Sequence, residues 1–484
     1  MKMLELPEFY FRPHVRQRMI EFLGGTHLEE ATCIWLTTAC DTGEEACPVL
    51  PPAALWSCLE RGCEIKRSLW DRTSLIVHLD VEYVNFDFPA EPYLDPKRTF
   101  DLQSPVIHEL QTLLLEHGIA PLHLLSGRGH HLIWRVRRDS DPFERLAELG
   151  VVPETLGTIY RAPQPPGGAV VGPALGRAFA GIGQVLEFLA HRVLDAQPAP
   201  LPLELTEVVT SRGERGREIV SLDLSEYGDP LPTRMIRIPF SAYQKVHAKR
   251  DALGAEVADA IPPLYVIPLF EMDYVRGLEV MRDAEKAARL ARVASAEIPD
   301  RTEGTGRLLE AYRGSAVARC HDWFYAQEQD PPWRWPETYD RTPWESLSPC
   351  VRSLLEQPND RLLKPVAIRH LVRVFLSLGW HPRHIAGLLR SKYERDFGWG
   401  MRFLHYDATT RAEFYVRLFS TLIATGRDSL EDFTCDEARA VELCTPEACH
   451  GCLDRYRLSL EARRHHERLA CRPLHGLFLP DPYS

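Results

Sequence analysis

Two carboxylates lie two residues apart in an apolar stretch of the sequence. Asp80 and Glu82 belong to the run SLIVHLDVEYV, whose β-branched and aromatic residues predict a buried strand. Side chains two apart on a strand point to the same face, so the two carboxylates should project together. Such a pair repels itself unless a cation lies between, and hard oxygen ligands suit Mg2+ or Mn2+. An edge strand with a solvated polar face is the alternative interpretation.

A glycine-containing turn between two apolar runs is the second chemical feature. Its residues are Ser126, Gly127, Arg128, Gly129, His130 and His131. Two glycines would let the backbone approach a ligand closely, and the serine, the arginine and His131 would supply hydrogen-bond donors for a triphosphate. An ordinary hairpin with a pair of surface histidines is the alternative.

A third carboxylate, Asp223, interrupts another apolar strand pattern, REIVSLDLSEY. The following run RMIRIPFSAYQK contains Arg237, Ser241 and Lys245, which could bind phosphate. A solvated basic face would explain the same residues. Each of the three features is weak alone, and their order along the chain is more specific than any one of them.

Strand and helix patterns alternate over residues 1–300, which predicts an α/β or α+β catalytic domain. The turn residues 126–129 should join two strands as a hairpin-like pair. Helical patterns are expected at 7–24, 104–117, 178–196 and 271–297.

The rest of the chain has a different pattern. Residues 301–345 are predicted as a linker or docking segment, because prolines and tryptophans concentrate at 327–346. Residues 346–484 are predicted to form a mainly α-helical domain. Its expected helices are 364–379, 382–395 and 409–426.

The three chemical features together resemble the archaeo-eukaryotic primase superfamily. Its catalytic subunits carry an Asp-x-Asp/Glu strand, a Ser-Gly-x-Gly-x-His type turn, and a further Asp before an Arg-x-Pro-x-Ser segment. The matching residues are Asp80, Glu82, Ser126, Gly127, Gly129, His131, Asp223, Arg237, Pro239, Ser241 and Lys245. The resemblance covers about residues 8–295. It implies an RRM-like primase core in which the three carboxylates bind two divalent metals, while the histidine and the basic residues contact the phosphates of the incoming nucleotide.

Cysteines form the remaining candidate metal site. The residues are Cys350, Cys435, Cys444, Cys449 and Cys452. The last four could close a structural zinc site by themselves. Alternatively, Cys350 is a distant fourth ligand of a [4Fe-4S] cluster, with one of Cys449 and Cys452 left out. We favour the cluster because residues 345–455 resemble the C-terminal domain of the primase large subunit, in which four cysteines hold one.

A second cysteine group precedes the carboxylates. It comprises Cys33, Cys40, Cys47, Cys58 and Cys63. Zinc knuckles of primase catalytic subunits usually follow the first metal motif, so burial is the expected role of this group.

Composition limits the possible functions. The chain has 57 Lys and Arg against 68 Asp and Glu, a formal charge of −11, which argues against bulk polyanion binding. Residues 352–402 hold ten basic and four acidic residues, so we expect a local DNA-binding patch that includes Trp380, Tyr393, Trp399 and Phe403. No run is long and apolar enough for a membrane span, and a soluble cytoplasmic protein is expected.

The leading prediction is a DNA primase-polymerase that starts and extends short primers on single-stranded DNA from nucleoside triphosphates. A metal-dependent nuclease is one rival, although it would need no triphosphate site. A non-catalytic DNA-binding protein that uses the cysteine domain is the other. The sequence contains no P-loop motif, so a helicase would have to be a separate partner.

Overall fold

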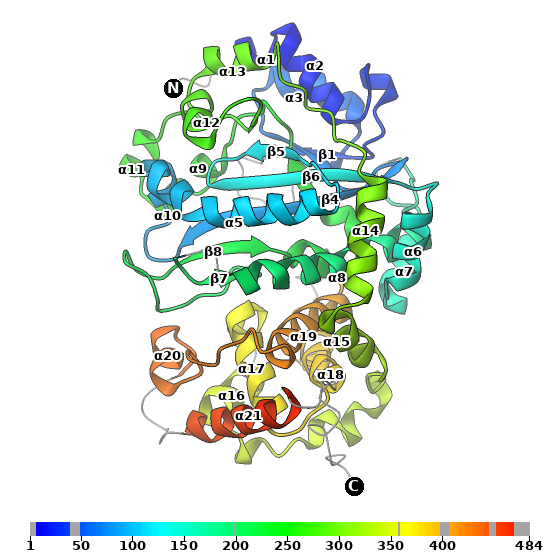
Figure 1. Cartoon of the computed structure of the whole chain (residues 1–484), viewed down its shortest axis with the longest axis vertical. Helices are drawn as coiled ribbons and strands as arrows, with labels where there is room; N and C mark the ends of the chain where they lie inside the picture. Colours follow the sequence, from blue (N-terminus) through cyan, green and yellow to red (C-terminus); the bar gives the residue numbers. More distant parts are fainter. Residues whose placement is uncertain are drawn as a thin grey trace.

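The computed structural model shows a mixed α/β chain with two β-sheets and a helical C-terminal part (Figure 1). It describes residues 6–38, 49–165, 167–196, 200–356, 359–396, 406–444 and 452–468. Within these ranges, no helix combines the length and the apolar character needed to cross a membrane.

The larger sheet has six strands in the order β10-β5-β6-β4-β8-β7. Every neighbouring pair is antiparallel except β7 and β8, which are parallel. The strands are β4 (Ser74–Asn85), β5 (Leu122–Leu125), β6 (Gly129–Arg137), β7 (Leu203–Glu204), β8 (Glu218–Asp223) and β10 (Ile267–Pro268). The predicted strand around Asp80 is therefore confirmed, and so is the hairpin, which β5 and β6 form.

The smaller sheet has four antiparallel strands in the order β2-β1-β3-β9. They are β1 (Leu36–Thr38), β2 (Val49–Leu50), β3 (Ile65–Ser68) and β9 (Met235–Arg237). The run 234–243 has strand character in the sequence, but β9 ends at Arg237. Pro239 has no N–H to donate, and Phe240 has a φ of 64°, so the backbone leaves the strand conformation.

Helices cover the large sheet. In Figure 1, α5 runs along β4 and β6, while α14 (Thr302–Arg313) crosses one end of the strands. Helix α8 packs against α5 and β4. The helices of the first 200 residues are α1 (Leu6–Tyr10), α2 (Pro13–Phe22), α3 (Leu55–Glu60), α4 (Glu91–Leu94), α5 (Pro96–Glu116), α6 (Asp141–Leu149), α7 (Glu154–Arg161) and α8 (Pro173–Ala196). Helix α5 therefore covers part of one face of the sheet.

Short helices follow β9. They are α9 (Lys245–Ala248), α10 (Arg250–Leu253), α11 (Ala255–Ala260), α12 (Tyr274–Val280) and α13 (Ala284–Leu290). The single helix predicted at 271–297 is wrong, because it is divided into α12 and α13. Asp273 and Asp283 explain the division, since each side chain accepts a hydrogen bond from a backbone N–H and caps a new helix.

The segment 301–345, which we expected to be a linker, begins with two packed helices. These are α14 and α15 (Ala316–Tyr325). Only the later part lacks long helices, and it forms the 3-10 turns η6 (Pro332–Glu337), η7 (Tyr339–Arg341) and η8 (Trp344–Ser346). Ser315 caps α15 by accepting a hydrogen bond from the Ala318 N–H.

The C-terminal helices lie together at one end of the molecule in Figure 1. They are α16 (Pro349–Leu355), α17 (Pro365–Ser377), α18 (Pro382–Ser391), α19 (Ala408–Ala424), α20 (Cys435–Ala440) and α21 (Cys452–Arg468). The three helices predicted at 364–379, 382–395 and 409–426 are confirmed as α17, α18 and α19.

Buried ion pairs join the C-terminal helices to the sheet side of the molecule. Arg417 of α19 pairs with Glu187 of α8, and both side chains are buried. Arg369 of α17 lies 3.0 Å from Glu204 of β7. The helical part therefore packs directly against the strands.

Candidate active site

The three predicted carboxylates lie on one face of the large sheet. Asp80 of β4 is directly opposite Asp223 of β8 in the antiparallel register, and Glu82 is opposite Ser221. Directly opposite residues share a face, and so do residues two apart on one strand. The fold thus brings together two carboxylates from one segment and a third from a segment 140 positions later.

Crowding of the carboxylates raises two of their pKa values. Burial raises the pKa of Asp80 well above its usual range, and repulsion from Glu82 and Asp223 raises it further. Burial also raises the pKa of Asp223 to about 6, although the Ser225 N–H donates a 2.9 Å hydrogen bond to its Oδ1. One atom, Asp80 Oδ1, is buried with no hydrogen-bond partner among the described residues.

Glu82 has the opposite behaviour because cations surround it. Burial alone would raise its pKa, but attraction by Arg128, Lys245, His131 and Arg237 lowers the pKa to about 2. Arg128 forms a direct ion pair with Glu82. It also lies 2.8 Å from Glu207, a second carboxylate that the sequence analysis did not identify.

No group of three or more His, Cys, Asp or Glu side chains in the described part of the chain is arranged as a metal-binding cluster. Glu82, one of the three predicted carboxylates, is paired with Arg128.

The glycine turn is tightly packed by protein atoms. The Ser126 N–H donates a 2.9 Å hydrogen bond to the Gly129 carbonyl, which closes the turn. A Cβ on Gly127 would lie 2.5 Å from the Tyr243 ring, and one on Gly129 would lie 2.1 Å from the Val81 carbonyl oxygen. We expected the glycines to make room for a ligand, but they make room for these two neighbours.

The two adjacent histidines of the turn point to opposite faces of β6. His131 lies on the carboxylate face, with Nδ1 3.4 Å from Asp80 Oδ1. His130 lies on the other face, where its ring is 5.0 Å from that of Phe100 and its Nδ1 is 2.9 Å from His123 Nε2. His131 is therefore the histidine that can reach a substrate of this site.

A cavity of about 870 Å3 lies on the face opposite the carboxylates, between α5, β5 and the chain around β10. His123 and His130 line it together with Gln111. It is separate from the candidate active site, because the sheet lies between them.

The three residues predicted after Asp223 have different surroundings. Arg237 pairs with Glu64 at 2.5 Å and lies over the Tyr243 ring at 4.5 Å. Ser241 is buried, and its hydroxyl is 3.4 Å from the Ile65 carbonyl oxygen, which indicates a role in packing.

Lys245 is the cation of this group that remains available. Among the described residues, its side chain has no ion pair or hydrogen bond, and burial lowers its pKa to about 8 against the attraction of Glu82. A half-buried ammonium without a partner is suited to an anionic ligand.

Glu226 and His78 also belong to the site, and the sequence analysis missed both. His78 Nδ1 lies 2.9 Å from Glu226 Oε2, and His78 Nε2 lies 2.8 Å from His131 Nδ1. Continuing the two-residue period of β4 back from Asp80 would have identified His78. No local signal marks Glu226, since it is located by the turn η4 (Ser225–Gly228) after β8.

The C-terminal cysteines lie partly outside the described residues. Cys449 lies outside them, and the side chain of Cys452 is not described either. Cys350 on α16 is buried, with its Sγ 3.4 Å from His370 Nε2 of α17. Cys435 is the first residue of α20, and Cys444 follows that helix.

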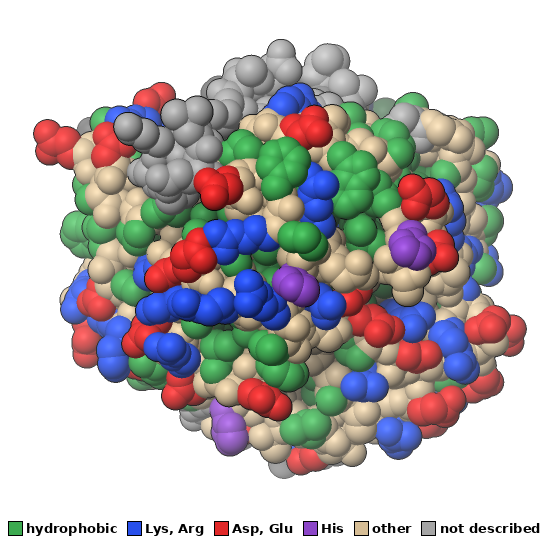
Figure 2. All heavy atoms as spheres, turned by 90° about the horizontal axis from the view of Figure 1, so that it is seen from above, with side chains coloured by type: hydrophobic (Ala, Val, Ile, Leu, Met, Phe, Trp, Pro, Cys, Tyr) green, Lys and Arg blue, Asp and Glu red, His purple; other side chains and the backbone are tan. Residues whose placement is uncertain are grey.

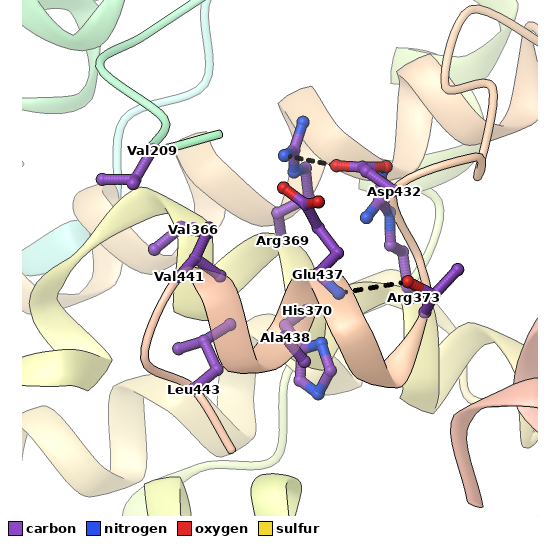
Figure 3. Close-up of a pocket in the computed structure, with 11 residues that line it drawn as sticks. Val209, Val366, Arg369, His370, Arg373, Asp432, Glu437, Ala438, Val441 and Leu443 are labelled. Carbon is purple, nitrogen blue, oxygen red and sulfur yellow. Dashed lines mark hydrogen bonds and ion pairs between the residues drawn. The ribbon is translucent and has the colours of Figure 1, made fainter. Parts of the chain in front are cut away.

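A small cavity lies between α17 and the segment 432–443, which contains Cys435. Figure 3 shows residues of α17 and of the 432–443 segment lining it, with Arg369 and Arg373 beside Asp432. Its volume is about 20 Å3, and His370, Ala438 and Leu443 are among its lining residues. His370 therefore contacts Cys350 and also faces the segment that carries Cys435 and Cys444.

Many basic residues of the patch expected at 352–402 are held in ion pairs. Arg373 is buried and pairs with Asp428 and Asp432, both at 2.7 Å. Other arginines of this range also form ion pairs, some of them at the surface: Arg369 with Asp432, Arg383 with Glu413, Arg390 with Glu394 and Arg395 with Asp340.

Two of the four aromatic residues of that patch are described, and both pack within the protein. Tyr393 is 1% exposed. Trp380 is half-buried and packs on Phe375, with ring centroids 4.8 Å apart. Trp399 and Phe403 lie outside the described residues.

Basic side chains gather elsewhere on the surface. Figure 2 shows a band of lysine and arginine with acidic side chains beside it, on the end of the molecule that carries α1, α2 and α13 in Figure 1. Arg12, which precedes α2, and Glu285 of α13 form an ion pair there. Basic charge at this end is thus partly offset by neighbouring carboxylates.

The N-terminal cysteines are only partly described. Cys33 and Cys58 are buried and Cys63 is half-buried, whereas Cys40 and Cys47 lie outside the described residues. Cys33 Sγ donates to the Trp35 carbonyl oxygen at 3.0 Å. Burial thus accounts for the described members of this group.

No known protein family and no curated protein matches this sequence. Among solved structures, the polymerase domain of Mycobacterium tuberculosis ligase D in complex with DNA is similar to part of it. The alignment covers 60% of this chain and 93% of that chain, with 12% identity and a TM-score of 0.30. A likeness at this TM-score supports no conclusion about function.

Proposed function

We propose that this chain is a DNA primase-polymerase, which joins nucleoside triphosphates on a single-stranded DNA template. One observation carries the proposal. Three carboxylates on two neighbouring strands face cations that come from the glycine turn, from β9 and from α9. Nucleotidyl transfer needs both sets, because cations must stabilise the triphosphate while carboxylates hold divalent metals.

The carboxylates fit Mg2+ or Mn2+ in their chemistry. Asp80 Oδ1 is buried without a hydrogen-bond partner among the described residues, and Asp223 lies opposite it. Two bound metals would favour the attacking alkoxide and offset the charge of the pyrophosphate leaving group. Glu82 would join this set by exchanging its ion pair with Arg128 for the metal.

The cations then bind the triphosphate. Released from Glu82, Arg128 would donate to phosphate oxygens from the turn next to Ser126 and His131. Lys245 needs no release, since no partner is recorded for it within the described ranges, and Arg237 adds positive charge from β9. Ser126, Gly127, Gly129 and Ser241 shape the site by packing.

The cysteine region is proposed to hold a [4Fe-4S] cluster through Cys350, Cys435, Cys444 and one of Cys449 and Cys452. Support comes from α17, where His370 contacts Cys350 and faces the 435–444 segment. Zinc bound by Cys435 to Cys452 is the alternative, which would leave Cys350 as a packed thiol.

One assay tests the proposed activity. Purified protein is incubated with Mg2+ or Mn2+ on single-stranded DNA, with ribonucleotides or deoxynucleotides, and with or without a primer. Synthesis that depends on template and triphosphate is expected. Degradation of the template without synthesis would favour a metal-dependent nuclease, and binding without either reaction would favour a DNA-binding protein.

A further inference from the structure

The turn η4 attaches to β4 just beyond the end of β8. Pairing of β8 with β4 ends at Asp223, which is opposite Asp80. Two residues before Asp80, the Tyr227 hydroxyl accepts a 3.1 Å hydrogen bond from the His78 N–H and donates a 2.8 Å hydrogen bond to the His78 carbonyl. The Tyr227 hydroxyl thus pairs with the backbone N–H and carbonyl of His78, which β8 no longer reaches. These two hydrogen bonds hold η4 against β4.

This attachment places Glu226 next to the side chain of His78. The two oxygens of Glu226 lie 2.9 and 3.1 Å from His78 Nδ1. On its other side, His78 Nε2 lies 2.8 Å from His131 Nδ1. Both histidines are buried, at 4% and 3% exposed. A continuous row of hydrogen bonds therefore leads from Glu226 to the histidine of the glycine turn.

The row has a defined direction. In the tautomer of His78 that donates from Nδ1 to a Glu226 oxygen, Nε2 of the same ring is a hydrogen-bond acceptor. His131 Nδ1 must then carry the hydrogen, and Asp80 Oδ1, at 3.4 Å, is a second acceptor near it. The remaining nitrogen of the ring, His131 Nε2, is buried and has no hydrogen-bond partner among the described residues.

We propose that Glu226 and His78 are positioning residues, which hold the His131 ring so that Nε2 faces the bound nucleotide. The inference rests on the proposed function, because it assumes that His131 contacts that nucleotide. Without Glu226, the His78 ring can turn or change tautomer, and His131 loses the acceptor that orients its Nδ1–H. Affinity for the nucleotide should then fall although no residue that touches it has changed.

A double-mutant cycle tests the proposal. Dissociation constants for ATP and dATP are measured by calorimetry with Mg2+ for the full chain and for Glu226→Ala, His78→Phe, His131→Ala and the double variant Glu226→Ala/His131→Ala. Each single variant should weaken binding about tenfold, the effect of one hydrogen bond to a charged group. The double variant should bind no worse than His131→Ala, because Glu226 acts only through His131.

Two further variants separate positioning from a general structural effect. Glu226→Gln keeps an oxygen acceptor for the His78 Nδ1–H and should restore near wild-type affinity. His130→Ala removes the adjacent histidine on the opposite face and should leave affinity unchanged. Thermal melting of every variant identifies any that fails to fold.

The outcomes are distinct. If His131→Ala weakens binding while Glu226→Ala and His78→Phe do not, the positioning role is overturned and the proposed function stands. Additive losses in the double variant would also overturn the positioning role. If His131→Ala itself binds normally, the nucleotide contact and the positioning role are both overturned.

Discussion

Arg128 pairs with Glu82, and Glu82 is one of the three carboxylates that the proposed reaction requires. The pair joins the glycine turn to β4, and both side chains are largely buried. Arg128 therefore holds Glu82 ionised before any ligand arrives. When metal and nucleotide bind, the same arginine becomes available to the triphosphate.

Arg128→Gln tests this double role. Loss of the cation leaves Glu82 buried without a direct partner and removes a charged donor from the nucleotide, so the KM for nucleotide should rise about tenfold or more. The measurement is steady-state synthesis on a primed template. Arg217→Gln is the control, since that arginine pairs with Asp87 away from the site and should leave KM unchanged. Equal KM values for both variants would contradict the role of Arg128.

The lowered pKa of Lys245 predicts that nucleotide use depends on pH. Its pKa of about 8 means that the ammonium is charged below pH 8 and loses its charge above it. Thus kcat/KM for nucleotide, which reports the free enzyme, should decline as pH rises from about 7 to 9. Lys245→Arg should flatten that decline because arginine stays charged. An identical decline in Lys245→Arg would exclude Lys245 as its origin.

Two features could be predicted from the sequence because they are local. The two-residue period of a strand places Asp80 and Glu82 on one face, and the apolar runs around the glycine turn predict the hairpin. Partners that arrive from distant segments could not be predicted in this way. Glu64 and Glu207 pair with Arg237 and Arg128 only because the fold brings those segments together.

The count of charges at 352–402 missed the ion pairs of this segment for the same reason. A count of charges along residues 352–402 cannot show that Arg373 is buried against Asp428 and Asp432, which lie more than fifty positions later. Charge in a sequence window predicts a surface only when its counter-charges are also in that window.

The Cys350→Ser variant should distinguish a [4Fe-4S] cluster from a zinc site. If Cys350 is a cluster ligand, protein purified without oxygen should be brown, with absorbance near 400 nm, and Cys350→Ser should lose both colour and iron. Initiation should then fall much more than extension of a supplied primer. Cys320→Ser is the control, because Cys320 is also buried but lies on α15. Colourless protein with one zinc per chain, unaffected by Cys350→Ser, would contradict the cluster.

Glu187 should stabilise the contact between α8 and α19. Burial would raise its pKa, but Arg417 and His321 lower the pKa to about 2, below its ordinary value of 4.5. A lowered pKa stabilises the fold above pH 4.5, and the stabilisation is lost as pH falls towards 2. Glu187→Gln should therefore cost about 3 to 5 kcal/mol at pH 7 and progressively less in acid.

Chemical denaturation at pH 7 and pH 3 measures this difference. Glu285→Gln is the control, since Glu285 is an exposed partner of Arg12 and its loss should leave the free energy of unfolding nearly unchanged. A cost for Glu187→Gln that does not depend on pH would contradict the electrostatic explanation.

The most direct test of the proposed function is synthesis by Asp80→Asn on single-stranded DNA with Mg2+ or Mn2+. Asparagine keeps the size of the side chain but removes the carboxylate that faces Asp223, so the variant should fold with a melting temperature no lower than that of the wild type and make no detectable product. Asp87→Asn, two residues beyond β4, is the matched control and should synthesise normally. Wild-type synthesis by Asp80→Asn would contradict the assignment of the three carboxylates as the catalytic metal ligands.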